Sequence, residues 1–282
     1  MRIDAHAHGI HAELGPAGKR VPPLVPGWKT TDGPPGEHIR QHNARGIEGV
    51  LLLDPPEIAF ELKRLFGDFV LPCPQVELET STPESIGALL DRGAVGIKFI
   101  APMHPYGDDR YLPLYAAIRD CRALAVFHTG YLTHGFYDPG LLLARPSWVN
   151  MTHMRPAELD RINRALPDLK IMMAHFGNPW WEEAWTVMAS NPNIYADLSG
   201  GTAWKKSMHM WKELFAPDGN LSVKAVSKLC YGTDSSMFHA GCFEYQPFGN
   251  FYDKFYEALK LPEEIRRKID RENILSLTCR SA

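Results

Sequence analysis

Two histidines stand two residues apart near the beginning of the chain, in the segment Ile3-Asp4-Ala5-His6-Ala7-His8. Because side chains alternate between the two faces of an extended strand, His6 and His8 project from the same face, roughly 6–7 Å apart. Two neutral imidazoles in this arrangement can bind one divalent metal ion. Taken alone, the pair is more typical of a solvated strand edge or a purification remnant than of a metal site. A metal site therefore requires further ligands from later segments.

Four more residues with suitable chemistry accompany other apolar segments of the chain. Lys98 lies within one such segment, and His128, His175 and Asp234 lie at the ends of three others. Each of these residues by itself is explained by a buried, hydrogen-bonded side chain in a protein core. Together with the first pair, they supply the three or four nitrogen and oxygen ligands of a mononuclear metal site with one open position.

The apolar segments alternate with helical ones along the whole chain. Apolar residues fill both faces of the predicted strands, which is typical of a parallel sheet covered on both sides. The predicted strands are Arg2–His6, Gly49–Leu53, Phe69–Cys73, Val95–Ile100, Leu124–His128, Leu169–His175, Ile194–Leu198 and Leu229–Thr233. Between them, Thr82-Pro83 and Asn178-Pro179 are each predicted to begin a helix, with the first residue as N-cap.

Eight alternations of strand and helix predict a (β/α)₈ barrel (TIM barrel), with an open doubly wound sheet as the alternative. No convincing domain boundary interrupts the 282 residues, so residues 1–282 are predicted to form a single domain. The Pro- and Gly-rich stretch Gly15–Gly36 is expected to be a long rim loop. The segment Phe251–Leu277 is expected to be helical and to cover the barrel exterior or a subunit contact in a homo-oligomer. In a barrel, the C-terminal ends of all strands meet at one rim, where the histidines, Lys98 and Asp234 would converge.

Composition excludes several classes of function. The formal net charge is −3, which does not favour binding to nucleic acid or to an acidic membrane surface. No apolar run approaches the ~18 residues that a transmembrane helix needs. The phosphate-binding motifs G-x-G-x-x-G after the first strand and G-x-x-x-x-G-K-[ST] are both absent. Five scattered cysteines without CxxC spacing are typical of reduced thiols, so a cytoplasmic protein is expected.

The order of the motifs resembles the amidohydrolase superfamily. The segments that carry the resemblance are His6-Ala7-His8, Ala174-His175-Phe176-Gly177 and Gly232-Thr233-Asp234. More narrowly, they are similar to the amidohydrolase-related branch that contains aminocarboxymuconate-semialdehyde decarboxylase and the resorcylate-type decarboxylases. The resemblance extends over nearly the whole chain.

The resemblance implies roles for individual residues. It implies that His6, His8, His128 and Asp234 hold a catalytic divalent metal ion. Asp234 would also accept a proton from the activated water. It implies that His175 acts as an acid or base beside the substrate, or binds a second metal. Histidine and aspartate ligands suit zinc, with manganese, iron or cobalt as alternatives.

Lys98 allows three interpretations. In binuclear members of the superfamily, a lysine on the matching strand is carboxylated and bridges two metals. As an ammonium group, Lys98 would instead pair with a substrate carboxylate or with Asp234. The third interpretation is a structural salt bridge in the barrel core. Because a plain lysine also occurs in branches that use one metal, one metal is favoured over two.

Substrate-binding candidates lie on the predicted rim loops. Arg145 and Arg155 could hold a substrate carboxylate through two hydrogen bonds, although surface charge is an alternative role. Tyr131, Trp148 and Trp180 could line a pocket for a planar ring or an acyl group, or simply pack loops together.

Three functions are compatible with these features. The favoured one is a metal-dependent hydrolase that attacks a small carboxylic ester, lactone or amide with metal-activated water. The second is a metal-dependent, non-oxidative decarboxylase of an unsaturated or aromatic carboxylic acid. The third is a barrel that binds metal without catalysing a reaction. In each case a small molecule, rather than a nucleic acid or a membrane, is the expected partner of the chain.

Overall fold

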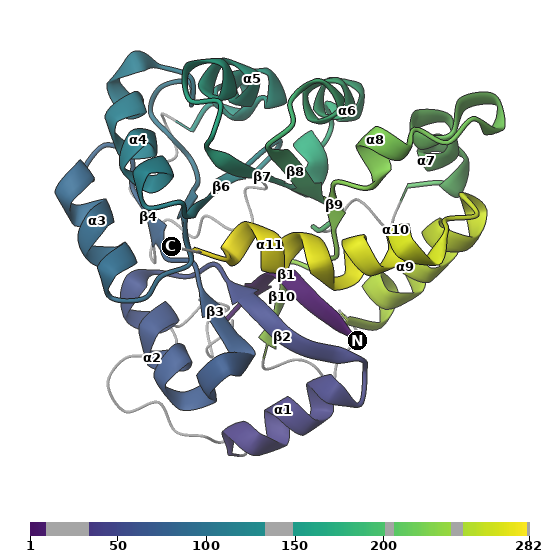
Figure 1. The fold of residues 1–282 in the computed structure, drawn as a ribbon, viewed down its shortest axis with the longest axis horizontal. Coiled ribbons are helices and arrows are strands. Elements are labelled where there is room, and N and C mark those ends of the chain that lie inside the picture. The colour runs from purple at the N-terminus through teal and green to yellow at the C-terminus, as the bar shows by residue number, and fades with distance from the viewer. Residues whose placement is uncertain (10–33, 133–148, 201–205, 238–244, 281–282) are drawn as a thin grey trace, which may run out of the picture.

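Parallel strands occupy the centre of the protein and helices surround them (Figure 1). The computed structural model describes residues 1–9, 34–132, 149–200, 206–237 and 245–280. Within these ranges the strands are β1 (Arg2–His8), β2 (Ile47–Leu52), β3 (Val70–Pro72), β4 (Gln75–Val76), β5 (Gly96–Phe99), β6 (Leu124–His128), β7 (Lys170–Ala174), β8 (Ile194–Asp197), β9 (Leu229–Cys230) and β10 (Ser235–Ser236). All eight predicted strands overlap these observed ones.

In the described ranges helices lie between most successive strands, and the last three helices follow the final strand. They are α1 (Pro35–Asn43), α2 (Pro56–Phe66), α3 (Pro83–Asp91), α4 (Leu112–Asp120), α5 (Pro156–Ala165), α6 (Trp181–Ser190), α7 (Met208–Phe215), α8 (Val223–Val226), α9 (Tyr245–Ala258), α10 (Glu263–Arg267) and α11 (Asn273–Thr278). None of these described helices is both long and apolar enough to cross a membrane.

Hydrogen bonds join the strands into a closed ring of eight positions. Strands β3 and β4 share one position, interrupted at Pro74, which has no N–H to donate. Strands β9 and β10 share the last position. Ala5 N donates to Tyr231 O at 2.8 Å, and β10 pairs in parallel with β1. The last strand position is therefore bonded to the first, which confirms the predicted barrel and excludes the open sheet.

Apolar side chains from alternate strand residues fill the barrel interior. This interior cluster contains Ile3, Ala5, Leu51, Leu53, Cys73, Leu124, Val126, Met172, Ala174 and Cys230. Ile274 and Leu277 of α11 belong to the same cluster, so α11 closes one end of the barrel. The remaining core packs between the strands and the surrounding helices, as is typical of a TIM barrel.

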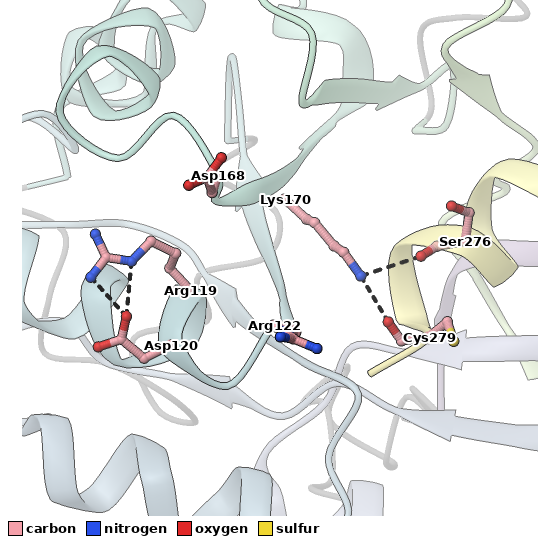
Figure 2. A pocket seen from close by; sticks show the side chains of 7 residues that line it. All are labelled: Arg119, Asp120, Arg122, Asp168, Lys170, Ser276 and Cys279. Carbon is pink, nitrogen blue, oxygen red and sulfur yellow. Dashed lines mark hydrogen bonds and ion pairs between the residues drawn. The ribbon is translucent and has the colours of Figure 1, made fainter. Parts of the chain in front are cut away.

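The end closed by α11 is the one where the strands begin. Lys170, the first residue of β7, donates from Nζ to Cys279 O at 2.8 Å and to Ser276 O at 3.3 Å (Figure 2). A hollow of about 810 Å³ beside Lys170 is lined by further polar residues, including Arg119 and Asp168. The prediction that Phe251–Leu277 is helical is confirmed, because α9, α10 and α11 cover most of this segment. Its α9 portion packs on the barrel exterior, whereas α11 covers the end instead.

Two predicted helix starts had different outcomes. Thr82 caps α3 as expected, because its side chain accepts a hydrogen bond from Ser85 N and the Ser85 side chain accepts one from Thr82 N. The prediction for Asn178-Pro179 is wrong, since α6 begins only at Trp181. Asn178 O instead accepts a hydrogen bond from Tyr131 N at 2.8 Å, which directs this backbone toward the neighbouring rim loop.

Tyr252 of α9 ties the last two strand positions together. Its hydroxyl accepts hydrogen bonds from Leu198 N and Gly232 N, both at 3.2 Å, and donates to Cys230 O at 3.0 Å. All of these atoms are buried. The hydroxyl therefore satisfies three backbone groups that have no access to water.

We expect Tyr252→Phe to lower the free energy of unfolding by about 1–3 kcal/mol, because buried backbone groups lose their partner. Urea unfolding followed by circular dichroism measures this change. Tyr131→Phe, at an exposed tyrosine, is the matched control and should change stability by less than about 0.5 kcal/mol. Equal stability of the two variants would contradict this role of Tyr252.

Candidate active site

Polar side chains from seven of the eight strand positions meet at the rim where the strands end. The residues are His6 and His8 on β1, Asp54 after β2, Lys98 on β5, His128 at the end of β6, His175 after β7, Asp197 at the end of β8 and Asp234 after β9. This rim is the end opposite α11. His6, His8 and Asp234, which were predicted to converge here, are in direct contact.

A β-bulge in β1 directs both histidines to the site. The pairing of β1 with β2 advances from Asp4 to Ala7 on one strand but only from Val50 to Leu52 on the other. The extra residue shifts the alternation of side chains by one. Ile3 and Ala5 consequently face the barrel interior below the bulge, and His6 and His8 face the rim above it. The two imidazole centres lie 5.4 Å apart.

The imidazoles of His6 and His8 share one carboxylate oxygen. Nε2 of His6 and Nε2 of His8 each lie 3.2 Å from Oδ1 of Asp234. Ligand atoms at about 2.0–2.1 Å from a tetrahedral metal ion lie about 3.3 Å from one another. The observed separations therefore fit the edges of a coordination shell, and the donor set of two imidazoles and a carboxylate suits a divalent ion such as zinc.

The second nitrogen of each imidazole contacts a buried aspartate. Nδ1 of His6 lies 2.9 Å from Oδ2 of Asp197, and Nδ1 of His8 lies 3.4 Å from Oδ1 of Asp54. Oδ2 of Asp54 also accepts a hydrogen bond from Gly9 N at 2.6 Å. Carboxylates in this position orient metal-binding imidazoles and leave Nε2 free to bind the metal.

Sequence reasoning missed Asp54 and Asp197. Both had a detectable signal, because Asp54 directly follows the predicted strand Gly49–Leu53 and Asp197 lies near the end of Ile194–Leu198. In a TIM barrel the C-terminal ends of the strands form the active site, and Asp54 and Asp197 occupy such ends just as His128 and His175 do.

Asp4 connects the two ligand-bearing segments. Its Oδ1 accepts hydrogen bonds from His6 N and Thr233 N, both at 3.0 Å, and its Oδ2 accepts one from Thr233 Oγ1 at 2.6 Å. Burial raises the pKa of Asp4 to about 6, although these hydrogen bonds oppose the shift. Asp4 therefore holds the His-x-His segment against the segment that ends in Asp234.

His175 is carried by a tight left-handed turn. Its φ is 66°, and the next two residues also have positive φ, so the strand predicted to include His175 ends at Ala174 instead. His175 N donates to Asp197 Oδ1 at 2.8 Å, and Gly177 N donates to Thr129 Oγ1 at 2.9 Å. Gly200 lies so close that a Cβ there would stand 2.8 Å from Nδ1 of His175.

His128 contacts the site through His175. Its Nδ1 lies 3.1 Å from Nε2 of His175, and its Nε2 is buried without a hydrogen-bond partner among the described residues. A buried nitrogen of this kind is available to a metal ion. The group formed by His6, His8 and Asp234 does not include His128, whose role as a ligand remains a prediction.

The charges of the site are strongly coupled. Burial by itself lowers the pKa of His8, but hydrogen bonds and charges of Asp234 and Asp54 raise it to about 10. Burial raises the pKa of Asp234, but the nearby His175 and His6 hold it well below its ordinary value. Burial lowers the pKa of His175 to about 4, so this imidazole is neutral at pH 7. The site thus combines anionic carboxylates, which attract a cation, with a neutral imidazole that can accept a proton.

The side chain of Lys98 is buried and lies on the face of β5 that is turned toward the barrel interior. Its Nζ makes no hydrogen bond within the described part of the chain. Burial lowers the pKa of Lys98 to about 8, although the charges of Asp197 and Asp234 raise it. The lysine therefore remains mostly an ammonium group at neutral pH, near the carboxylates of Asp197 and Asp234.

The proposed substrate-binding residues lie in varied surroundings. Arg155 pairs with Glu183 and stacks over Trp180, with its guanidinium carbon 5.0 Å from the ring centre. Tyr131 is exposed. Arg145 and Trp148 lie outside the described residues. A substrate role for these five residues therefore remains a prediction.

Comparison with protein families agrees with this geometry. Residues 3–277 match the family model described as amidohydrolase. The chain belongs to the amidohydrolase family. Its resemblance to that superfamily, noted from the motifs, is thereby confirmed. None of the curated proteins matches the chain in sequence.

Solved structures of low sequence identity share the fold. 2,6-Dihydroxybenzoate decarboxylase from Rhizobium is 16% identical, with 98% of each chain covered and a TM-score of 0.60. A probable 2-pyrone-4,6-dicarboxylic acid hydrolase from Acinetobacter baumannii is 13% identical over 98% of each chain, with a TM-score of 0.60. An uncharacterised TIM-barrel protein from Bordetella bronchiseptica is 20% identical, covers 86% of this chain and 81% of its own, and has a TM-score of 0.62.

We expect Asp54→Asn to weaken binding of Zn²⁺ by about 10- to 100-fold, because the carboxylate that orients His8 is lost. Competition with a chromophoric chelator measures the dissociation constant directly. Glu57→Gln, at an exposed position of α2, is the matched control and should bind Zn²⁺ like the unmodified protein. Unchanged affinity in Asp54→Asn would show that Asp54 does not support a metal ligand.

Proposed function

We propose that this amidohydrolase family member hydrolyses a small carboxylic ester, lactone or amide with the help of one divalent metal ion, most simply Zn²⁺. The observation that carries the proposal is the convergence of Nε2 of His6, Nε2 of His8 and Oδ1 of Asp234, with the neutral His175 alongside. Manganese, iron or cobalt are alternative ions for the same donor set.

The proposed metal ligands are His6, His8 and Asp234, with His128 as the fourth. When bound, the ion would lower the pKa of water and polarise the substrate carbonyl group. The two carboxylates behind the imidazoles, Asp54 and Asp197, keep the Nε2 atoms directed at the ion.

The chain's own residues would handle the protons of the reaction. Oδ1 of Asp234 faces both imidazoles, whereas its Oδ2 makes no hydrogen bond with a described residue and can accept the proton that water loses. His175 is neutral at pH 7 and lies beside His6, with ring centres 4.5 Å apart. We assign it the relay of this proton, which it would accept from Asp234 and pass to the departing oxygen or nitrogen.

Lys98 would contribute positive charge to substrate binding. A buried ammonium group below the site would attract a carboxylate on the substrate, so acidic esters, lactones or amides are the favoured class. Carboxylation of Lys98 in a binuclear site is the competing interpretation, which the neutral fraction of the amine also permits.

Decarboxylation is the second candidate reaction. Lys98 supports it as well, because the same ammonium group could hold the carboxylate of an unsaturated or aromatic acid. The Rhizobium relative with the same fold is itself a decarboxylase of an aromatic acid. The family acts on small molecules, and we propose that the enzyme works in the cytoplasm, as a homo-oligomer, without nucleic-acid or membrane partners.

Hydrolysis and decarboxylation differ in the atoms that enter the product. We expect the Zn²⁺-loaded enzyme, given a panel of carboxylic esters, lactones and amides in H₂¹⁸O, to place one ¹⁸O atom in the product carboxylate. Mass spectrometry detects this label. Asp234→Asn should lower kcat/KM by about 10²- to 10⁴-fold, whereas Asp168→Asn in the hollow at the opposite end should not. Release of CO₂ from aromatic or unsaturated acids, with no hydrolysis of the panel, would contradict the proposed hydrolysis and identify the enzyme as a decarboxylase.

The pH dependence of substrate binding tests Lys98. Its positive charge is present below about pH 8 and is lost as the pH rises, so 1/KM for a carboxylate-bearing substrate should fall through pH 8. Lys98→Met should raise KM at least about tenfold at pH 7 and remove this dependence. Lys228, another buried lysine whose pKa burial lowers to about 8, provides the control Lys228→Met, which should retain it. A pH-independent KM in the unmodified enzyme would contradict binding through Lys98.

A further inference from the structure

We propose that Ser199, together with Asp197, is a positioning residue that keeps the proton of neutral His175 on Nδ1 and leaves Nε2 as the basic atom. The inference rests on the proposed function, because a base with its lone pair on Nε2 is useful only to a reaction at this rim. Nothing in the sequence motifs pointed to Ser199.

Ser199 stands at the meeting point of three site residues. It follows β8 by two positions and is buried. Its Oγ lies 3.0 Å from Nδ1 of His175 and 3.1 Å from Nδ1 of His6, and it donates a short hydrogen bond to Oδ1 of Asp197. The hydroxyl is therefore shared by two imidazoles and one carboxylate.

Proton counting decides the direction of these contacts. Oδ1 of Asp197 accepts hydrogen bonds from His175 N and Ser199 N as well as from the Ser199 hydroxyl. An ionised carboxylate can only accept, so the single hydroxyl proton of Ser199 is used on Asp197. The Ser199 oxygen can then only accept from its other neighbours. Nδ1 of His175 must consequently carry a proton.

The position of Nε2 follows directly. A neutral imidazole has one N–H, so protonation at Nδ1 leaves a lone pair at Nε2 of His175. This atom faces Nδ1 of His128 at 3.1 Å, which is then the donor in that contact. Nδ1 of His6 likewise donates to Asp197, at 2.9 Å from Oδ2, and its Nε2 lone pair faces Asp234. One buried carboxylate thus sets the tautomers of His6 and His175 together.

The backbone around Ser199 is shaped for this contact. Gly200 has a φ of 86°, and a Cβ at this position would stand 2.8 Å from Nδ1 of His175. A side chain here would push His175 away from the Ser199 hydroxyl. The close approach of His175 to residues 199 and 200 is therefore part of the local fold.

Nitrogen NMR of histidine-labelled, metal-free enzyme at pH 7.5 tests the proposal, because long-range ¹H–¹⁵N spectra distinguish protonated from unprotonated ring nitrogens. We expect His175 to show a protonated Nδ1 and an unprotonated Nε2. In Ser199→Ala the Nε2–H form should appear, and kcat of the Zn²⁺-loaded enzyme should fall about tenfold with little change in KM. Ser199→Thr keeps a hydroxyl and should restore both the Nδ1–H signal and kcat.

Ser235→Ala is the matched control, because Ser235 is a buried serine on β10 whose hydroxyl contacts no described histidine. Its histidine spectrum should equal that of the unmodified enzyme. His175 protonated on Nε2 in the unmodified enzyme, or an unchanged spectrum in Ser199→Ala, would overturn the proposal. The spectra need neither metal nor substrate, so absence of hydrolysis would refute the proposed function while leaving the tautomer result intact.

Discussion

The hydrogen bond from Asp234 N to His6 O, 2.7 Å long, joins the last strand position to the first at the level of the site. The contact that closes the barrel consequently also brings Asp234 beside the two histidines. Because both segments are strand ends, their relative position is determined by backbone hydrogen bonds rather than by mobile side chains. Asp4 strengthens this junction by binding both His6 N and the Thr233 hydroxyl. The remaining strands pack around this junction and add His128, His175 and Asp197.

Charge burial is the second constraint on the site. Asp54 and Asp197 are fully buried, and buried carboxylates are unfavourable unless several donors satisfy them. Asp197 accepts hydrogen bonds from His175 N and Ser199 N, Asp54 accepts one from Gly9 N, and each carboxylate lies against a histidine. The same carboxylates contact Nδ1 of His6 and Nδ1 of His8 and thereby orient both imidazoles. Stability of the buried charges and orientation of the site therefore depend on the same contacts.

Much of the fold was predictable from short-range patterns. The eight strands were recognisable because apolar residues fill both of their faces, and Thr82 identified the start of α3 through its local hydrogen bonds. The start of α6 was mispredicted because Asn178 O is bound by Tyr131, a contact that no local pattern reveals. His-x-His likewise predicted a shared face correctly. The bulge that turns this face toward the rim depends on pairing with β2 and was not visible in the sequence.

The sequence by itself determined which residue types lie at the strand ends, and hence which side chains at this rim of an amidohydrolase barrel are candidate metal ligands. Periodicity and local capping are properties of neighbouring residues, so they can be read along the chain. Only the tertiary structure decided which carboxylate serves which imidazole. His6 and Asp197 are 191 positions apart, and His8 and Asp234 are 226 positions apart. Their contacts arise from closure of the ring, because strand order and register, not sequence spacing, determine which side chains meet.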